Sequence, residues 1–211
     1  MKLYFVRHGK TEWNLEGRFQ GSNADSPLLP EALEDIAELG DYLSTVAFDK
    51  VYSSDQKRAY DTAQLLIDKN EKDIPVETSL CLREWNLGIL ENKKISNMEA
   101  IYPKQMYAFR HNLAQFNATQ FKAESVFQVT HRIADFVKDL KEIQAENILI
   151  VGHGASMTAA IRHLLGFPAA QLRRAGGLSN SSVTILETED FEQFNLITWN
   201  DTAFLDKKKV I

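Results

Sequence analysis

Apolar residues along the chain form two kinds of pattern that alternate from one end to the other. Short apolar runs rich in β-branched and aromatic residues predict strands over 3–6, 48–54, 75–78, 147–152, 182–187 and 195–199. Apolar residues at helical spacing predict helices over 30–45, 59–67, 126–143 and 155–165. Strands that alternate with helices favour an α/β fold in which helices are layered on a mostly parallel sheet.

Two stretches interrupt this alternation. Residues 11–30 are polar and rich in Gly, Ser and Pro, which predicts a long ordered loop of the kind that often carries function. From about 91 to 127 the helical periodicity weakens, and aromatic residues are scattered among Lys, Gln, Asn and Arg. We predict a small helical cap there, inserted between core elements, with the aromatic side chains forming the cap's own core.

Length and charge narrow the class of protein. The 211 residues suffice for one domain over 1–211 that carries the cap as an insertion. The net charge of −5 disfavours nucleic-acid and membrane partners, so an anion site must gather positive charge locally. The single Cys81 excludes an internal disulfide and a cysteine-rich metal site. The first apolar run is cut short by Arg7, and no run is long enough to span a bilayer, so we expect a cytoplasmic protein. Residues 207–209 are expected to form a solvated basic tail.

Two of the predicted strands end in the same way, with a histidine followed by a glycine. The first run passes into Arg7 and His8, and the run over 147–152 passes into His153. Glycine after each histidine allows a sharp turn and the close approach of backbone to a ligand. A cation and two imidazoles therefore stand where strands end, and this is the edge at which open α/β sheets bind ligands.

A second cation is predicted at the same edge. Asp55 follows the second strand and suits the start of a helix, as N-cap or as first-turn acid, which places Arg58 in the first turn. A cation beside the positive end of the helix dipole is unfavourable unless an anion binds there. Because right-handed crossovers bring the ends of parallel strands to one edge, Arg58 is expected close to Arg7 and the two histidines.

This group of side chains suits an anion better than a metal ion. Arginine repels a cation, and two histidines without carboxylates or thiolates make a weak ligand set. The donor fork of arginine matches phosphate, and neutral imidazole is a competent nucleophile toward phosphorus. Asn14 can donate a hydrogen bond to a phosphoryl group, and Glu84, in the loop-like stretch 82–88, can protonate a leaving alkoxide. A module that only binds phosphate would use the arginines without needing Glu84.

The same residues resemble a known family. The motifs are RHGKTEWN at 7–14, SSDQKRA at 53–59, LRE at 82–84, VGHG at 151–154 and NSSV at 180–183. Together they are similar to those of the histidine phosphatase superfamily, also called the phosphoglycerate mutase-like family. The resemblance implies a three-layer α/β/α sandwich and a phosphohistidine intermediate.

The resemblance also implies a role for each matching residue. His8 would be the phosphorylated nucleophile, and Glu84 the proton donor that later activates water. The phosphate pocket would comprise Arg7, Arg58 and His153, supported by Asn14. The remaining substrate-binding positions would be Gln20, Gly21 and Gly154. We expect a small phosphorylated metabolite as the substrate, no cofactor and no metal, and we leave a homodimer open.

The family contains both phosphatases and cofactor-dependent mutases. A mutase must hold a bisphosphorylated intermediate, so it needs cationic groups beyond the phosphate pocket. The residues after Glu84 are Trp-Asn-Leu-Gly, whereas the mutases typically have Arg-His-Tyr-Gly. We therefore predict a metal-independent phosphomonoester hydrolase of the histidine acid phosphatase type. A phosphoglycerate mutase is the alternative, and a phosphate- or phosphopeptide-binding module is the remote one. Departures from the family pattern at Lys10, 28–32 and 91–92 leave the substrate open.

Overall fold

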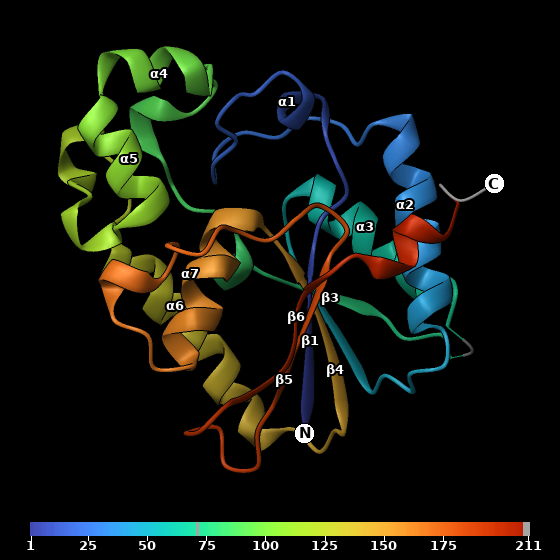
Figure 1. Ribbon diagram of the computed structural model, residues 1–211. Coiled ribbons are helices and arrows are strands. Elements are labelled where there is room, and N and C mark those ends of the chain that lie inside the picture. The colour runs from blue at the N-terminus through green and yellow to red at the C-terminus, as the bar shows by residue number, and fades with distance from the viewer. Residues whose placement is uncertain (71, 209–211) are drawn as a thin grey trace.

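The strands form a single sheet that places the predicted site at one edge. The computed structural model describes residues 1–70 and 72–208, with side chains as far as residue 205. The sheet has the order β3-β2-β4-β1-β5-β6 (Figure 1). Its strands are β1 (Lys2–Arg7), β2 (Lys50–Ser54), β3 (Val76–Ser79), β4 (Asn147–Gly152), β5 (Val183–Glu187) and β6 (Asn195–Asp201).

The sheet is parallel at its centre and antiparallel toward one edge. β1 pairs parallel with β4, and β4 and β3 both pair parallel with β2. The last two strands run antiparallel, β5 against β1 and β6 against β5. β1 and β4 are buried along almost their whole length, which explains their continuous apolar composition. The register sets Arg7 opposite Gly152, so that His8 and His153 follow at neighbouring strand ends.

Helices cover both faces of the sheet, as expected for a three-layer α/β/α sandwich. The helices are α1 (Glu12–Leu15), α2 (Pro30–Leu43), α3 (Lys57–Ile67), α4 (Ile95–Ile101), α5 (Pro103–His111), α6 (Val126–Asp139) and α7 (Gly154–Leu164). α2 and α3 pack on one face, and α6 and α7 pack on the other (Figure 1). α6 begins with a capping box, in which Ser125 and Gln128 satisfy each other's backbone N–H groups.

The segment between η2 (Gly88–Leu90) and α6 packs above the α7 side of the sheet (Figure 1). It contains α4, α5 and two 3₁₀ turns, η3 (Leu113–Gln115) and η4 (Ala118–Phe121). Phe109, Phe116 and Phe121 pack together in its core with the fully buried Trp85. The prediction that these aromatic side chains form a core holds for the three phenylalanines, but that core is shared with Trp85 from outside the cap, and Tyr107 and Phe127 are exposed.

Three local predictions need correction or fall outside the structure. The polar stretch 11–30 is not all loop, because Thr11 begins the short α1 with a capping box closed by Asn14. Asp55 is not the N-cap or a first-turn acid of α3, since Gln56 holds the N-cap position. Asp55 instead accepts two hydrogen bonds from Arg83, at 2.7 and 2.6 Å. The expected basic tail at 207–209 lies outside the residues whose side chains are described. In the part of the chain that is described, no helix has the length and apolar composition needed to cross a membrane.

Candidate active site

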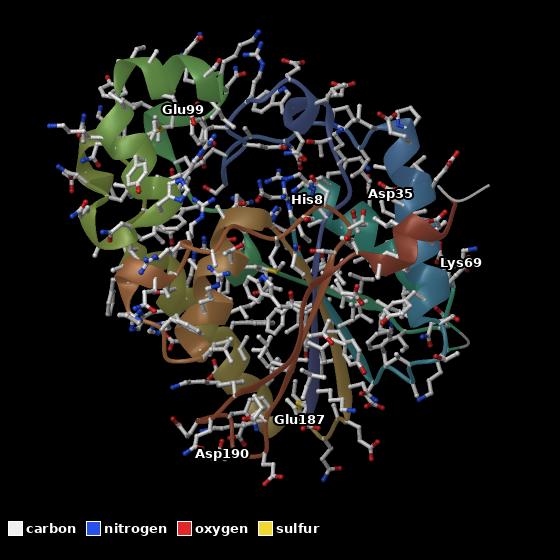
Figure 2. The ribbon with its side chains drawn as sticks, in the orientation of Figure 1. His8, Asp35, Lys69, Glu99, Glu187 and Asp190 are labelled. Atoms are coloured by element: carbon white, nitrogen blue, oxygen red, sulfur yellow. The ribbon has the colours of Figure 1, made fainter. Side chains whose placement is uncertain are left out.

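His8 follows directly after β1, and hydrogen bonds with backbone groups hold both its main chain and its ring in place. Figure 2 shows it at the end of β1 that faces α1. The His8 N–H donates to the Gly152 carbonyl at 3.0 Å, and Nδ1 lies 2.6 Å from the Gly9 carbonyl. Since a carbonyl only accepts, Nδ1 carries the proton and Nε2 keeps a free lone pair. Burial, together with the charges of Arg58 and Arg7, holds the pKa of His8 well below 6.5, so the ring is neutral near pH 7.

His153 lies beside His8 and is fully buried. The two ring centroids are 5.3 Å apart at an interplanar angle of 60°. Neither ring nitrogen of His153 has a hydrogen-bond partner among the described residues. Burial and the nearby charge of Arg58 hold the pKa of His153 well below 6.5. A buried neutral imidazole with an unused donor costs free energy unless an acceptor arrives, so this ring suits an incoming oxyanion.

Arg7 is held beside the N-terminus of α7. Its Nη1 donates to the Leu178 carbonyl at 2.6 Å, and its buried Nε has no partner. Burial lowers the pKa of Arg7 to about 10, so the side chain remains a cation at neutral pH. A Cβ on Gly154 would lie 2.9 Å from the Arg7 guanidinium carbon, so a glycine is required where this helix begins.

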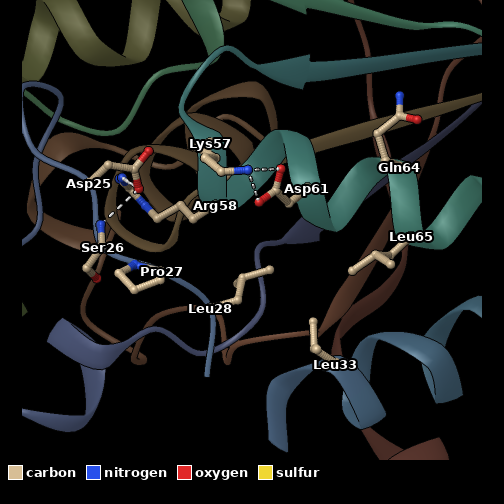
Figure 3. A pocket seen from close by; sticks show the side chains of 10 residues that line it. All are labelled: Asp25, Ser26, Pro27, Leu28, Leu33, Lys57, Arg58, Asp61, Gln64 and Leu65. Carbon is tan, nitrogen blue, oxygen red and sulfur yellow. Dashed lines mark hydrogen bonds and ion pairs between the residues drawn. The ribbon is translucent and has the colours of Figure 1, made fainter. Parts of the chain in front are cut away.

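Arg58 is buried between the sheet edge and the loop before α2. Its Nη1 donates to Asp25 Oδ1 at 2.9 Å and to the Ala24 carbonyl at 3.0 Å, and its Nη2 donates to the Gly21 carbonyl at 3.4 Å. Its Nε has no hydrogen-bond partner in the part of the chain that the structure describes. Figure 3 shows the ion pair between Arg58 and Asp25. Both residues line a second cavity, of about 700 Å³, that lies between α2 and α3. That cavity is larger than the one beside His8 but contains neither histidine nor Glu84, so we place the site by its chemistry.

Glu84 is clamped by backbone N–H groups. Its Oε1 accepts from Trp85 and Ser156, both at 2.7 Å, and its Oε2 accepts from Ala155 at 2.9 Å. Two of these donors lie in the first turn of α7, whose dipole favours a carboxylate at that end. Oε2 has one partner against two for Oε1, so it is the oxygen with more free capacity for a hydrogen bond to a bound molecule.

A cavity of about 330 Å³ joins most of the predicted residues. Arg7, His8, Asn14, Gln20, Glu84 and Gly154 line it. Arg58 and His153 are not among its lining residues, although both act electrostatically on His8 or contact its ring. Gly21 does not line it either, and a Cβ there would collide with the Glu91 carboxylate. Gly21 therefore contributes its carbonyl to Arg58 rather than a wall to the cavity.

The two predicted amide side chains, Gln20 and Asn14, differ in which hydrogen-bonding groups are already used within the protein. Gln20 is used at both ends, accepting from Thr11 and donating to Ser26. Asn14 accepts through Oδ1 from Asn180 at 3.2 Å and from the Thr11 N–H at 3.2 Å. Its NH₂ group has no hydrogen-bond partner among the described residues, and the residue lines the cavity. Asn14 thus suits a phosphoryl oxygen better than Gln20 does.

Several supporting residues carry no recognisable signal in the sequence. Gln56 accepts from the Glu84 N–H at 3.0 Å and donates to the Gly21 and Ala24 carbonyls. Arg132 donates to the carbonyls of Cys81, Arg83 and Glu84, and it pairs with Glu124. Thr62 accepts from the Gly9 N–H at 3.1 Å. Asn180 donates to the His8 carbonyl at 3.0 Å, and only its place in the NSSV motif could have pointed to it.

The arrangement can hold and transfer a phosphoryl group. It combines a neutral imidazole with a free Nε2, two arginines with unpartnered Nε atoms, an unpartnered second imidazole and a carboxylate. Such groups stabilise charge on equatorial phosphoryl oxygens through position and electrostatics. Among the described residues, no three or more His, Cys, Asp or Glu side chains are grouped in a way that could hold a metal ion.

Comparison with known proteins agrees with this geometry. The model of the histidine phosphatase superfamily (branch 1) matches residues 3–202. "Probable phosphoglycerate mutase GpmB" of Salmonella paratyphi A is 28% identical over 195 residues, which are 90% of this chain and 86% of that protein.

Solved structures with this fold include phosphatases. Bacillus stearothermophilus YhfR has a TM-score of 0.86 at 28% identity, over 95% of this chain and 96% of that one. Mycobacterial glucosyl-3-phosphoglycerate phosphatase has a TM-score of 0.85 at 28% identity, over 94% and 98% of the two chains. The α-ribazole phosphatase of Shigella flexneri has a TM-score of 0.81 at 26% identity, over 96% and 97%. Since the family model covers nearly the whole chain, this protein belongs to the histidine phosphatase superfamily, branch 1.

Proposed function

We propose that the protein is a phosphomonoester hydrolase that works without a metal, through a phosphohistidine on His8. One observation carries this proposal: a neutral, backbone-anchored imidazole with a free Nε2 lines the same cavity as the carboxylate of Glu84. A nucleophile and an acid in one cavity are what a two-step hydrolysis requires.

In the first step, His8 Nε2 attacks the phosphorus of the bound ester. The bond between phosphorus and the ester oxygen breaks, and the leaving alkoxide takes the proton from the Glu84 carboxyl group. The N–P bond forms, and the phosphoryl oxygens are held by Arg7 and Asn14, which line the cavity. Arg58 and His153 lie behind the lining, next to His8, and contribute through the charge and polarity that they place there. Anchoring of Nδ1 to the Gly9 carbonyl keeps the ring oriented and stabilises the positive charge that develops on it.

In the second step, the Glu84 carboxylate takes a proton from water. The water oxygen attacks phosphorus, the N–P bond breaks, and inorganic phosphate leaves with His8 neutral again. The site then returns to its starting protonation, because the proton that Glu84 gave to the alcohol is replaced from water.

Two observations favour hydrolysis over the mutase reaction: the residues that follow Glu84, and the activities of similar solved structures. Trp85 is fully buried in the core of the cap segment, so this position offers no charge to a second phosphoryl group. Arg18, Arg110 and Arg173 do line the cavity, so the preference for hydrolysis rests mainly on the similar structures. Two of the similar structures are titled as phosphatases, one of glucosyl-3-phosphoglycerate and one of α-ribazole. The mutase alternative rests on the name of a relative that is 28% identical.

Product analysis tests the proposal. Purified protein is mixed with 3-phosphoglycerate, with and without 2,3-bisphosphoglycerate, and with p-nitrophenyl phosphate, in the presence and absence of EDTA. We expect phosphate release without 2-phosphoglycerate, insensitive to EDTA and abolished in His8→Ala. Isomerisation that depends on the bisphosphate would establish a mutase instead. A metal requirement after EDTA would contradict the metal-independent route.

A leaving-group series tests the role of Glu84 separately. A protonated acid matters most when the departing alkoxide is a strong base. Glu84→Gln should therefore slow hydrolysis of alkyl phosphates much more than hydrolysis of p-nitrophenyl phosphate. An equal loss for both would count against Glu84 as the acid. Binding of phosphate by a protein that hydrolyses no ester would support the binding-module alternative.

A further inference from the structure

Arg173 is a cation at the cavity that the hydrolysis leaves unexplained. It lies between α7 and β5 and lines the cavity beside His8. Its Nη1 donates to the Phe109 carbonyl at 3.0 Å, and its guanidinium stacks over the Phe109 ring at 4.4 Å. Among the described residues, neither Nε nor Nη2 has a hydrogen-bond partner, and no carboxylate pairs with this side chain.

The free atoms of Arg173 form one edge of the guanidinium. The same Nε and Nη2 edge holds a carboxylate at two other places in this protein. Arg83 donates through Nε and Nη2 to the two oxygens of Asp55, at 2.7 and 2.6 Å. Arg132 does the same to Glu124, at 2.7 and 3.0 Å. The same edge of Arg173 suits a carboxylate and is filled by no described side chain; its Nε is buried, so Nη2 is the atom that a ligand in the cavity meets first.

The side chains that line the cavity carry more positive than negative charge. Arg7, Arg18, Arg110 and Arg173 line it, whereas Glu84 is the one acid among its described lining residues. Arg18 and Arg110 have surface partners in Glu16 and Glu99, but among the described residues no carboxylate lies within ion-pair distance of Arg173. Burial lowers the pKa of Arg173 to about 10, against the charge of Glu84, which raises it, so the side chain is still a cation at neutral pH. A partly buried cation without a direct ion pair is costly, and a bound anion offsets that cost.

We propose that the Nε and Nη2 edge of Arg173 binds a carboxylate on the leaving group of the substrate, which is therefore a phosphorylated acid. This inference rests on the proposed hydrolysis at His8. Arg7 and Arg58 serve the phosphoryl group at the sheet edge, whereas Arg173 is fixed to α5 through Phe109. Leu87, Ile95 and Leu178 line the cavity as well and offer apolar contact to the carbon skeleton of the ester.

Matched pairs of esters test this proposal. Each pair differs in a carboxylate: phosphoglycolate against 2-hydroxyethyl phosphate, and 4-carboxyphenyl phosphate against 4-carbamoylphenyl phosphate. The pairs differ in length, so that two spacings between phosphorus and carboxylate are sampled. We expect the wild type to prefer the acid by kcat/KM in at least one pair. Arg173→Gln should reduce that preference by about 10- to 100-fold, and Arg173→Lys should restore part of it.

Arg162 provides the matched control. It also donates through Nη1 to a backbone carbonyl, that of Leu172, and stacks on an aromatic ring, that of Trp199. It does not line the cavity beside His8. Arg162→Gln should therefore leave the preference for the acid as it is in the wild type. A merely structural role for Arg173 would reduce hydrolysis of both members of a pair equally, which would overturn the proposal.

Calorimetry separates this inference from the proposed hydrolysis. In His8→Ala, the preferred acid should bind more tightly than its uncharged partner, and adding Arg173→Gln should remove the difference. Binding of the acid through Arg173 without hydrolysis of any ester would refute the proposed function and leave only the carboxylate-binding role of Arg173. Hydrolysis with no preference for an acid in either pair would overturn this inference alone.

Discussion

Gly154 and Arg7 are in such close contact that the first residue of α7 has no room for a side chain. A Cβ built on Gly154 would lie 2.9 Å from both Cζ and Nε of Arg7. Arg7 is fixed on its other side by the bond to the Leu178 carbonyl. Its guanidinium therefore has one place to lie, and that place is set by the glycine after His153.

Gly154→Ala should displace the Arg7 guanidinium and lower kcat/KM for p-nitrophenyl phosphate by about 10- to 100-fold, since small misplacements of phosphate-binding groups have effects of that size. Steady-state kinetics measure the change. Gly40→Ala on α2 is the control, because the closest contact of its methyl group would be the Lys69 side chain, away from the cavity beside His8, and activity should stay at the wild-type level. Equal activity of both variants would show that Arg7 does not bind the phosphoryl group.

The two buried histidines predict an acid-sensitive fold. The pKa values of His8 and His153 are held well below 6.5 in the folded state, so the unfolded chain binds more protons as the pH falls below about 6.5. The free energy of unfolding should fall over pH 6.5–5.0, with each histidine contributing up to about 1.4 kcal/mol per pH unit. Urea unfolding across this range should give a shallower slope for His153→Gln than for the wild type. An unchanged slope would contradict the burial of a neutral His153.

Arg132 should matter for stability and for turnover through the loop that carries Glu84. Its side chain is 21% exposed and that of Glu124 is 15% exposed, so Arg132→Met leaves a largely buried carboxylate unpaired. We expect a loss of about 3 kcal/mol in urea unfolding, together with a lower kcat. Arg83→Met breaks the more exposed pair with Asp55, at 38% and 26%, and should cost less than about 1 kcal/mol. Similar losses from both substitutions would argue against this ranking.

Gly88 should be far less tolerant of alanine than Gly17. Both have a left-handed φ, of 55° and 66°, which L side chains adopt at a cost of about 1 kcal/mol. A Cβ on Gly88 would also lie 2.1 Å from the Phe121 carbonyl oxygen, whereas one on Gly17 would meet nothing within 4 Å. Thermal unfolding should therefore show Gly88→Ala destabilised by several kcal/mol more than Gly17→Ala. Equal effects would mean that the backbone near Phe121 moves freely.

The sequence predicts the residues of the site better than it predicts what holds them. Arg7, His8 and His153 follow from apolar runs that stop at a strand end, because strand ends meet at one edge whatever surrounds them. The N-cap of α3 could not be found in this way, because Asp55 is taken by Arg83, 28 residues further along the chain. Local sequence patterns can identify an acidic residue near the start of a helix, but they cannot identify a partner that lies far away in the sequence.

The same limit applies to the supporting contacts. Arg132 reaches the carbonyl of Glu84 across 48 residues, and Asn180 reaches that of His8 across 172. Asn180 is marked only by its place in the NSSV motif, and Arg132 by no pattern, since an arginine in a polar stretch is equally typical of a solvated surface. Arg173 is of this kind, since only its place at the cavity and its free edge distinguish it.

The aromatic core shared by Trp85 and the cap segment makes the protein evolutionarily modular. Phe109, Phe116 and Phe121 pack with Trp85, whereas the strands that present the two histidines pack in the sheet cores on either side. Substitutions within residues 95–121 can thus reshape the outer cavity without moving the reactive imidazoles. A randomised library restricted to this segment is therefore the natural starting point for changing which ester the proposed hydrolysis accepts.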